Sequence, residues 1–453
     1  MEPVDGLHFR LARLADGWAR NVRLSVQGGR VIGVERDRAP VAGDARHGIA
    51  LPGLPNLHSH AFQRGMAGLA ERRGPSDDSF WTWREIMYRF VDRIGPEALK
   101  AMAALAYVEM LETGFTRVGE FHYVHHSPDG RPYDNPAEMA TALAAAADET
   151  GIGLTLLPVF YAHSGFGGTP PGAGQRRFVC DPDRFARLLE ASRAAVATLP
   201  DAQVGLAPHS LRAVTPDELA LLPAMAAGGP IHIHVAEQVR EVEDCLAWSG
   251  ARPVEWLLDH IEVDARWCLV HATHMRDDEA ARMARTGAVA GLCPITEANL
   301  GDGLFNAPAY LAAGGRFGIG SDSNVLIDAS EELRLLEYGQ RLGHRGRNLF
   351  PQSEGHSSGH ALFDAAVAGG AQALGVSGGL QVGAAADLVS LDDTHPSLAG
   401  KAPDTVLDSW IFAAGRTAID GVWRRGRQVV VGGRHVRRAA VEAAYADVMQ
   451  ALL

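Results

Sequence analysis

Lysine and paired cysteines are scarce in this chain of 453 residues. The four cysteines are scattered, and no two of them form a Cys-x-x-Cys pair, so the sequence offers neither a zinc ribbon nor a disulfide framework. Of the 42 basic residues, only Lys100 and Lys401 are lysines. Schiff-base catalysis would need one of these two, and neither lies in a segment that resembles a catalytic site. Chemistry based on thiols or on a lysine imine is therefore not expected.

Long apolar runs and clusters of basic residues are also missing. Charged residues interrupt every long apolar stretch, and the opening MEPVDGLHFRLARLADG has no cationic segment followed by an apolar one. We therefore expect no membrane span, no signal peptide and a cytoplasmic protein. Acidic residues outnumber basic ones by 54 to 42, a formal charge of −12, which argues against a surface that follows nucleic-acid phosphates. The expected partner is a small molecule, with no nucleic acid and no membrane involved.

The chain does contain enough apolar material for a large core, with 47% hydrophobic residues. Short alternating runs with tight Gly-Gly turns occur near both ends, as in NVRLSVQGGRVIGVER and TAIDGVWRRGRQVVVGGRH. We expect residues 1–50 and 365–435 to pair into one small composite domain, a β-sandwich, with the middle of the chain inserted between its halves. A C-terminal helix is expected over 436–453.

Residues 51–364 show the pattern of parallel βα units, in which short apolar runs alternate with helical segments rich in Ala, Leu and Arg. The eight runs are GIALPGLPNLHSH, FTRVGEF, IGLTLLPVFY, AQVGLAPHS, GPIHIHVAE, RWCLVHATH, GAVAGLCP and RFGIGSDSN. Eight parallel units predict an α/β fold with a (β/α)8 barrel of the TIM type. Two loops rich in Gly, Pro and Ser, 161–180 and 323–359, are candidate lids over its mouth.

Polar residues able to bind a metal stand where these runs end. His58 and His60 close the first run, and the strand period of two points both imidazoles to the same side. His234, His271 and Asp322 stand at the ends of the fifth, sixth and eighth runs. A barrel brings the carboxyl ends of its strands to one mouth, so these side chains are expected to converge. Imidazole nitrogens with one carboxylate oxygen suit a borderline cation such as Zn²⁺.

Other histidine and acidic residues near these positions have more than one interpretation. His232 lies on the same face as His234 but one layer deeper, where we expect a structural role, and His274 is expected to begin the next helix. Glu237 follows His234 by three residues, so its carboxyl group is expected near a metal-bound water in an acid/base role. The alternative for Glu237 is a carboxylate that stabilises a helix N-terminus. Glu120 ends the second run, and we expect it to be structural.

The segments LPGLPNLHSHAFQR, HVAEQ, LVHATH and GIGSDSN resemble the amidohydrolase superfamily, in particular its deaminases with a single metal ion. GAAADLVSLD and VWRRGRQVV are similar to the small β domain of that superfamily. The resemblance implies one divalent ion per subunit, with Zn²⁺ expected although the same donors accept Fe²⁺ or Mn²⁺. Binuclear members bridge their metals with a carboxylated lysine after the fourth strand, and here that segment reads APHSLRAV. The implied metal ligands are His58, His60, His234 and Asp322.

The same resemblance implies roles in catalysis. The metal lowers the pKa of a bound water to about 7 for attack on an sp² carbon that bears nitrogen. His271, which is not needed as a ligand, and Asp322 help to take the water proton, while Glu237 passes protons to the substrate nitrogen so that ammonia leaves. The expected activity is hydrolysis of a C–N bond, and the order in which these three groups act stays open at this point.

The segments HSHAFQRG, GEFHYVHH, APHSLRAV and FWTWRE narrow the resemblance to deiminases of a small anionic amino-acid derivative that carries a formimidoyl group. Arg212 is suited to bidentate binding of a carboxylate and His209 to a further hydrogen bond. Arg84, expected in the loop after the first strand, is a candidate for a second carboxylate. Gln63 and Tyr123 are expected to hold the amino-acid portion or the formimidoyl group. Family members are commonly homodimers, so a homodimer is expected.

Two alternatives remain. A nucleobase deaminase or chlorotriazine hydrolase of the same superfamily would share all four metal ligands, and it would need stacking residues and amide donors where Arg212 and His209 stand. A metal-binding barrel without catalysis, acting as an interaction or regulatory protein, is the second alternative. The presence of Glu237, His271 and Asp322 together argues against it.

Overall fold

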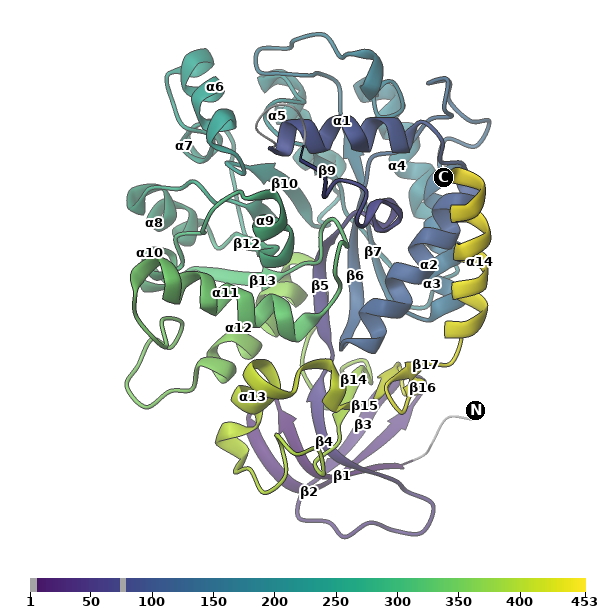
Figure 1. Ribbon diagram of the computed structural model, residues 1–453, viewed down its shortest axis with the longest axis vertical. Helices are drawn as coiled ribbons and strands as arrows, with labels where there is room; N and C mark the ends of the chain where they lie inside the picture. The colour runs from purple at the N-terminus through teal and green to yellow at the C-terminus, as the bar shows by residue number, and fades with distance from the viewer. Residues whose placement is uncertain (1–5, 74–78) are drawn as a thin grey trace.

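The computed structural model describes residues 6–73 and 79–453, which form a barrel and a smaller β domain (Figure 1). The barrel strands are β5 (Leu54–Ser59), β6 (Phe115–His122), β7 (Gly153–Phe160), β8 (Gln203–Val204), β9 (Ala207–Pro208), β10 (Ile231–Val235), β11 (Trp267–His271), β12 (Val289–Leu292) and β13 (Arg316–Ile319). They are parallel and hydrogen-bonded in the order β10-β11-β12-β13-β5-β6-β7-β8, with β9 also paired to β7. Most of their residues are buried, because helices cover the outside of the barrel.

Short bridges close the barrel. Leu206 pairs with Ile231 and Ser210 with His234, so the fourth strand, which is broken into β8 and β9, meets β10. A Cβ on Gly205, at the break, would lie 2.3 Å from the carbonyl oxygen of Pro230, and only glycine permits so close an approach. The eight runs recognised in the sequence coincide with these eight strand positions, and the predicted (β/α)8 barrel is confirmed.

Helices follow the barrel strands, and most of them cover the outside of the barrel, whereas α9 lies at its mouth. They are α2 (Pro96–Glu112), α3 (Glu138–Thr150), α4 (Pro182–Val196), α5 (Pro216–Met225), α6 (Val239–Ser249), α7 (Pro253–His260), α8 (Asp277–Thr286), α9 (Pro294–Leu300), α10 (Ala307–Ala312) and α12 (Ser358–Ala373). In α4, Asp181 caps the N-terminus by accepting a hydrogen bond from the backbone N–H of Arg184, and Phe185, Leu188 and Leu189 form the buried face. Such amphipathic helices bury the outer face of the barrel.

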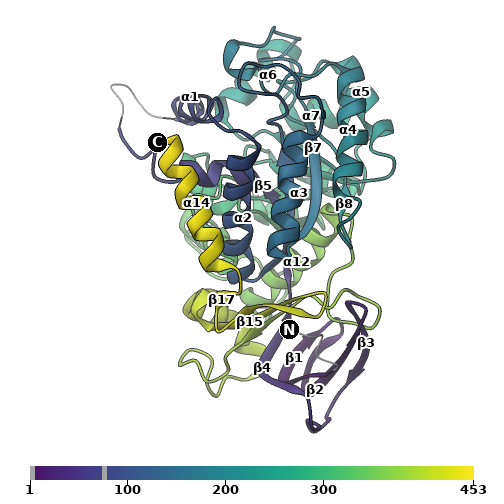
Figure 2. The same cartoon turned by 90° about the vertical axis from the view of Figure 1, so that its right-hand side faces the viewer.

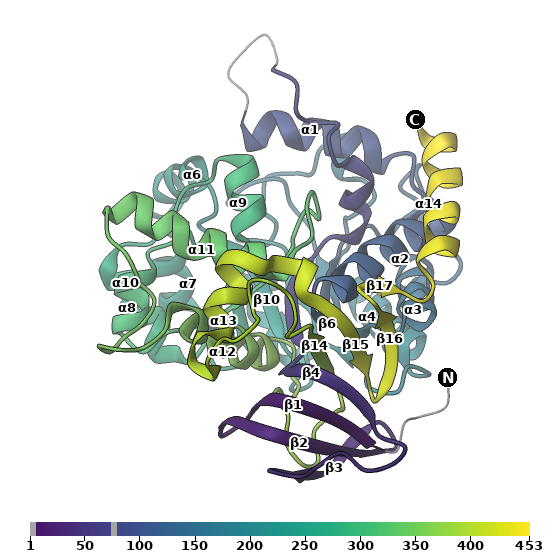
Figure 3. The ribbon, with the colours of Figure 1, turned by 60° about the horizontal axis from the view of Figure 1, so that its bottom comes forward.

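The β domain unites the two ends of the chain in one sheet. Its strands are β1 (Gly6–Leu14), β2 (Gly17–Gln27), β3 (Arg30–Glu35), β4 (Ala45–Pro52), β14 (Leu388–Leu391), β15 (Ile419–Arg424), β16 (Arg427–Val431) and β17 (Arg434–His435). β14 pairs with β4, which joins the two halves (Figure 3). The sheet curls until Arg30 of β3 bridges Ala385, and it encloses a core of its own around Phe9 and Trp423.

The connections between the two parts refine the expected boundaries. The expected boundary at 364/365 falls inside α12, which packs against β5, β12 and β13 and so stays with the barrel. The C-terminal helix α14 (Arg438–Leu452) lies beside α2 (Figure 2). It is held there by ion pairs from Arg438 to Glu109 and Glu112.

Two segments that the sequence analysis treated as loops are helices. FWTWRE, with Arg84, begins α1 (Phe80–Val91), which lies over the mouth of the barrel and starts at a capping box formed by Ser79 and Thr82. Most of the first half of the expected lid 323–359 is α11 (Ala329–His344), capped by Asp328. Both helices begin with a capping side chain followed by apolar residues at helical spacing, a signal that the Gly, Pro and Ser content of the flanking segments obscured. Within the described ranges, no helix combines the length and the apolar character needed to cross a membrane.

A network of ions joins the β domain to the barrel at the face opposite the mouth. Arg424 of β15 binds Asp387 and, at 2.9 Å, the carboxylate of Asp201, which also accepts a hydrogen bond from Arg117 of β6 at 2.7 Å. Both arginine side chains are almost fully buried. Burial acts to raise the pKa of Asp201, but Arg424 and Arg117 outweigh it and lower that pKa. The ionised form of Asp201 therefore stabilises the junction.

We expect Asp201→Asn to lower the free energy of unfolding at pH 7 by roughly 2–4 kcal/mol, because it leaves two buried guanidinium groups with one carboxylate. The folded-state pKa of Asp201 is depressed, so its contribution is present above the pKa of about 3.9 that an aspartate has in an unfolded chain, and it is lost as the pH falls below that value. Urea unfolding at pH 7 and near pH 3 measures both effects. Asp16→Asn, in an exposed pair with Arg36, is the control and is expected to leave the midpoint unchanged; an equal loss in both variants would contradict the prediction.

Candidate metal centre and active-site pocket

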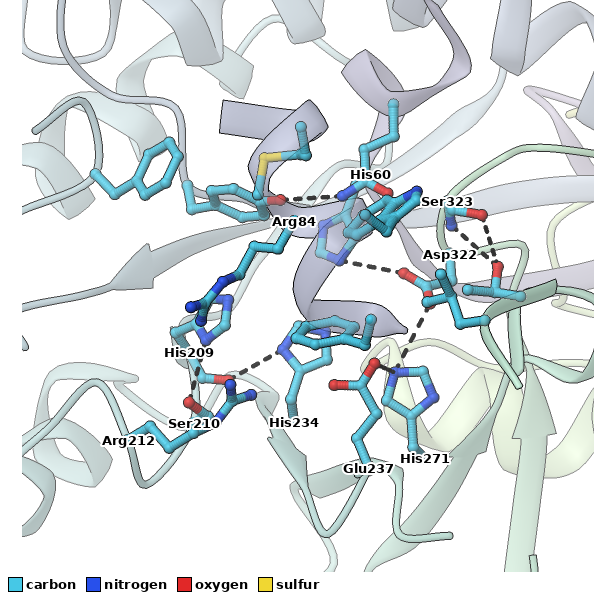
Figure 4. Close-up of a pocket in the computed structure, with 18 of the residues that line it drawn as sticks. His60, Arg84, His209, Ser210, Arg212, His234, Glu237, His271, Asp322 and Ser323 are labelled. Atoms are coloured by element: carbon cyan, nitrogen blue, oxygen red, sulfur yellow. Dashed lines mark hydrogen bonds and ion pairs between the residues drawn. The ribbon is translucent and has the colours of Figure 1, made fainter. Parts of the chain in front are cut away.

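One pocket at the carboxyl ends of the barrel strands collects the residues that the sequence analysis selected (Figure 4). His58 lies directly beneath it, fully buried, in contact with His60 and His234. The other ten line its wall: His60, Gln63, Arg84, Tyr123, His209, Arg212, His234, Glu237, His271 and Asp322. Residues from six of the eight strand positions, and from helix α1, therefore meet in one place.

Three imidazoles and one carboxylate meet at the base of this pocket. The Nε2 atom of His58 lies 3.2 Å from Nε2 of His60 and 3.1 Å from Nε2 of His234. Oδ1 of Asp322 lies 3.2 Å from Nε2 of His60 and 3.4 Å from Nε2 of His58. One ligand atom from each of the four side chains lies within 4.8 Å of all the others.

The hydrogen bonds around these imidazoles fit metal ligands. Nδ1 of His60 donates to the carbonyl oxygen of Phe121 at 2.9 Å, and Nδ1 of His234 donates to that of His209 at 3.0 Å, so both Nε2 lone pairs face inward. Burial lowers the pKa of His58 to about 3 and also lowers the pKa values of His60 and His234. Converging neutral nitrogens beside a carboxylate repel one another unless a cation lies between them. The donor set therefore fits one divalent metal ion of the borderline type.

A buried polar network that the sequence analysis missed fixes the backbone of the ligands. Asn324 donates to Ser59 Oγ and to the carbonyl oxygens of His60 and Asp322, all within 3.1 Å. Asp322 itself adopts φ +43°, and its N–H donates to the carbonyl oxygen of His58. The strained backbone turns its carboxylate toward the histidines. The serine and asparagine of GIGSDSN were visible in the sequence, but their partners were not.

His271 is held by carboxylates on both sides. Its Nδ1 lies 3.2 Å from Oε1 of Glu297, and its Nε2 lies 3.7 Å from Oε1 of Glu237 and 3.7 Å from Oδ2 of Asp322. Burial acts to lower the pKa of His271, but the carboxylates outweigh it and raise that pKa to about 10. Burial raises the pKa of Glu237, against the opposing charges of His271 and Arg212. Acid and base groups with displaced pKa values thus stand beside the candidate metal centre.

Two of the supporting carboxylates were not singled out from the sequence. Glu241, fully buried in α6, accepts hydrogen bonds at 3.1 Å from the N–H groups of Ala236 and Glu237, which fixes the turn that carries Glu237. Glu297 in α9 orients His271. Nothing in their local sequence distinguishes them from other helical glutamates, because their partners lie on the turn before α6 and on β11.

The opposite side of the pocket carries positive charge (Figure 4). Arg212 is 8% exposed, and among the described residues no carboxylate lies within ion-pair distance of its guanidinium group. The Nε atoms of Arg212 and of Arg84 are both buried without a hydrogen-bond partner. The guanidinium group of Arg84 lies 4.6 Å from the ring of Trp81, and that of Arg212 lies 5.7 Å from it. The aromatic face of α1 therefore positions two cations that make no direct ion pair within the described part of the chain.

Smaller polar groups complete the wall. Nε2 of Gln63 donates to the hydroxyl of Tyr123 at 3.0 Å, and its Oε1 is buried without a partner. Burial and the charge of Arg212 lower the pKa of His209, so this imidazole is neutral. Of the residues given a structural role, His232 binds the carbonyl oxygen of Ala373, and Glu120 accepts the N–H of Ala61.

His232 and His234 form a His-x-His pair on β10, and replacing each in turn tests which of them is a metal ligand. We expect His234→Asn to weaken binding of Zn²⁺ by more than about 100-fold, beyond the effect of losing an outer hydrogen bond. His232→Asn, two residues away on the same strand, is the matched control and should retain one ion per chain. Metal analysis after dialysis measures both, and loss of the ion from His232→Asn alone would overturn the assignment.

The comparisons with known proteins agree with this geometry. The model of the amidohydrolase family matches residues 49–429, and that of the formimidoylglutamate deiminase HutF, N-terminal domain, matches residues 6–48. A formimidoylglutamate deiminase from Pseudomonas aeruginosa is 53% identical over 98% of both chains. An 8-oxoguanine deaminase from the same organism is 28% identical over 84% of this chain and 83% of its own.

Solved structures give the same result. A crystal structure of an amidohydrolase from Brucella melitensis superposes with a TM-score of 0.96 at 58% identity and covers 99% of both chains. An adenosine deaminase from Xanthomonas campestris with bound zinc has a TM-score of 0.81 at 23% identity, covering 99% of this chain and 98% of its own, a likeness that shows the fold alone. The chain belongs to the amidohydrolase family.

Proposed function

We propose that the protein hydrolyses N-formimidoyl-L-glutamate to N-formyl-L-glutamate and ammonia, a step of histidine degradation. The relative from Pseudomonas aeruginosa that matches the whole chain bears the name of this activity, and so does the model that matches residues 6–48. The structural observation that carries the proposal is Arg212, a buried cation that faces the same pocket as the candidate metal centre and has no carboxylate of the described residues within ion-pair distance.

The two arginines explain the choice of substrate. A buried charge without a partner is costly, and a carboxylate of the ligand removes this cost by binding it in a bidentate manner. N-formimidoyl-L-glutamate has two carboxylates, and the pocket offers Arg212 and Arg84 for them. His209, which lies beside Arg212, can add a further hydrogen bond. A neutral purine or pyrimidine would leave both guanidinium groups unpaired.

The reacting end of the substrate then lies against the acid and base groups. When bound, the divalent ion lowers the pKa of water to about 7 and so supplies a nucleophile at neutral pH. Asp322 presents Oδ1 to the histidine cluster and Oδ2 to His271. It therefore connects the place of water activation with His271, which in its neutral form takes the first water proton, and the surrounding carboxylates stabilise the protonated imidazole that results.

Glu237 is placed to complete the reaction. Water oxygen adds to the formimidoyl carbon, the bond from this carbon to the terminal nitrogen breaks, and both water protons end on the departing nitrogen as ammonia. A carboxyl group with a raised pKa can give and regain a proton near neutral pH. The pair Gln63 and Tyr123 lies close enough to the cluster to orient the formimidoyl group or the neighbouring amino-acid portion.

Three further parts of this proposal rest on chemistry and resemblance. Zn²⁺ is the proposed ion, because three imidazoles and one carboxylate suit it. The cytoplasm is the proposed location, and all four cysteines are free and buried, which suits a reducing compartment. A homodimer is proposed from the family resemblance, and light scattering tests it.

Ammonia release tests the activity directly. We expect the metal-replete protein to release ammonia from N-formimidoyl-L-glutamate and to act far more slowly on N-formimidoyl-L-aspartate, guanine and cytosine. His271→Ala and Glu237→Gln should each abolish most of this activity, which excludes a contaminating enzyme. Turnover of guanine or cytosine with silence on the glutamate compound would overturn the substrate while leaving the metal centre intact.

Arg212→Ala tests the carboxylate contact. We expect kcat/KM for N-formimidoyl-L-glutamate to fall by at least about 100-fold, corresponding to roughly 3 kcal/mol for a buried charged contact. The rate with the diamide of the same compound, which has no carboxylate, should change little.

Arg240→Ala is the matched control for that variant. The guanidinium group of Arg240 lies 4.7 Å from the ring of Trp81, but the residue does not line the pocket. An equal loss in Arg240→Ala would show that packing around Trp81, rather than a carboxylate contact, determines the effect.

A further inference from the structure

A second group of metal-binding atoms lies next to the first. We infer that His271, Cys293 and Asp322 form a separate inhibitory site for a soft divalent cation such as Cd²⁺ or excess Zn²⁺. One ligand atom from each of these side chains lies within 4.8 Å of the other two, and all three residues are buried. The inhibitory effect rests on the proposed function, whereas the binding of the cation does not.

The orientation of His271 favours this site. Oε1 of Glu297 binds its Nδ1 and also accepts the N–H of Cys293 at 2.9 Å, so one carboxylate ties together two of the three donors. Nε2 of His271 is fully buried and has no hydrogen-bond partner among the described residues. A histidine whose Nδ1 is held by a carboxylate and whose Nε2 is free has the arrangement of metal-ligating histidines.

Asp322 is placed between the two groups. Its Oδ1 lies 3.2 Å from Nε2 of His60, in the first group, and its Oδ2 lies 3.7 Å from Nε2 of His271, in the second. A carboxylate that offers one oxygen to each side can bridge two cations about 3.5–4 Å apart. The second site therefore needs no displacement of the first ion.

The chemistry of Cys293 determines which cations fit. Sulfur from this residue makes the site softer than the cluster of three histidines, so Cd²⁺ and Zn²⁺ are favoured over Mg²⁺ or Mn²⁺. Donor atoms around a tetrahedral zinc ion lie about 3.3–3.6 Å apart, given its bond lengths, so small side-chain movements would close the present triangle. Binding releases the thiol proton of Cys293 and one proton of the His271 imidazole, so that the lone pair on Nε2 becomes available to the cation.

Occupation of this site is incompatible with the proposed reaction. The same Nε2 atom of His271 that accepts the water proton would be bonded to the second cation, and Oδ2 of Asp322 would no longer face it freely. Because His271 cannot accept the water proton while it binds the second cation, we expect excess metal to inhibit the reaction.

Cadmium titration of the zinc-loaded protein tests the inference with Cys293→Ala and Cys293→Ser. Cys268→Ala is the matched control, because Cys268 belongs to the same buried apolar cluster as Cys293 but is not part of the triad. We expect the wild type and Cys268→Ala to take up one Cd²⁺ per chain beside the retained Zn²⁺, with the ultraviolet absorption of a cadmium–thiolate bond. Both Cys293 variants should lose this absorption and bind Cd²⁺ at least about 10-fold more weakly.

Activity provides the second measurement, with each variant compared with its own rate before cadmium is added. We expect cadmium to inhibit the wild type and Cys268→Ala, and the Cys293 variants to resist it over the same range. Thiolate absorption that persists in both Cys293 variants, or inhibition that accompanies loss of Zn²⁺, would overturn the site. Cadmium uptake without thiolate absorption in the wild type would show an adventitious ion only. Because the metal measurements need no substrate, they stay decisive even if the proposed reaction fails.

Discussion

The contact on which the active-site pocket depends is the meeting of three uncharged imidazoles and one carboxylate whose ligand atoms all lie within 4.8 Å of one another. Such a group is unfavourable alone, because its lone pairs repel and its carboxylate is buried. The protein holds it in place from outside, through backbone carbonyls that accept Nδ1–H groups and through Asn324, which donates to the carbonyl oxygens of His60 and Asp322. A divalent ion bound by these four donors removes their repulsion and stabilises the folded protein.

The charges around the pocket are divided between its two sides. Arg84 and Arg212 lie on one side, and Glu237 and Asp322 lie beside His271 on the other (Figure 4). Glu297 binds Nδ1 of the same imidazole. In the proposed function, this division of charge orients a substrate that has carboxylates at one end and a hydrolysable amidine at the other. The second donor group around Cys293 arises from the same crowding of acidic and histidine side chains.

The active-site pocket and the contacts that join the barrel to the β domain lie at opposite ends of the barrel strands. The ion network of Arg117, Asp201 and Arg424 lies at the opposite end of the strands, where it joins the β domain. Changes there are expected to alter stability, whereas changes at the mouth alter binding and reaction, which is the general division in barrels of this type. β4 of the β domain continues through Gly53 directly into β5 of the barrel, so the chain itself also joins the two parts.

The sequence by itself determined the barrel, the sheet shared by the two ends, and which strand-end residues meet, because the strand period and the common mouth of a barrel are properties of the chain pattern. It did not reveal that Arg84 lies on a helix, that 329–344 is helical, or that Glu241, Glu297 and Asn324 hold the site. Only the tertiary structure decided these, since each acts through partners brought close by folding. It also decided that Arg212 is buried with no carboxylate of the described residues within ion-pair distance, because the absence of such a neighbour depends on every element packed around it.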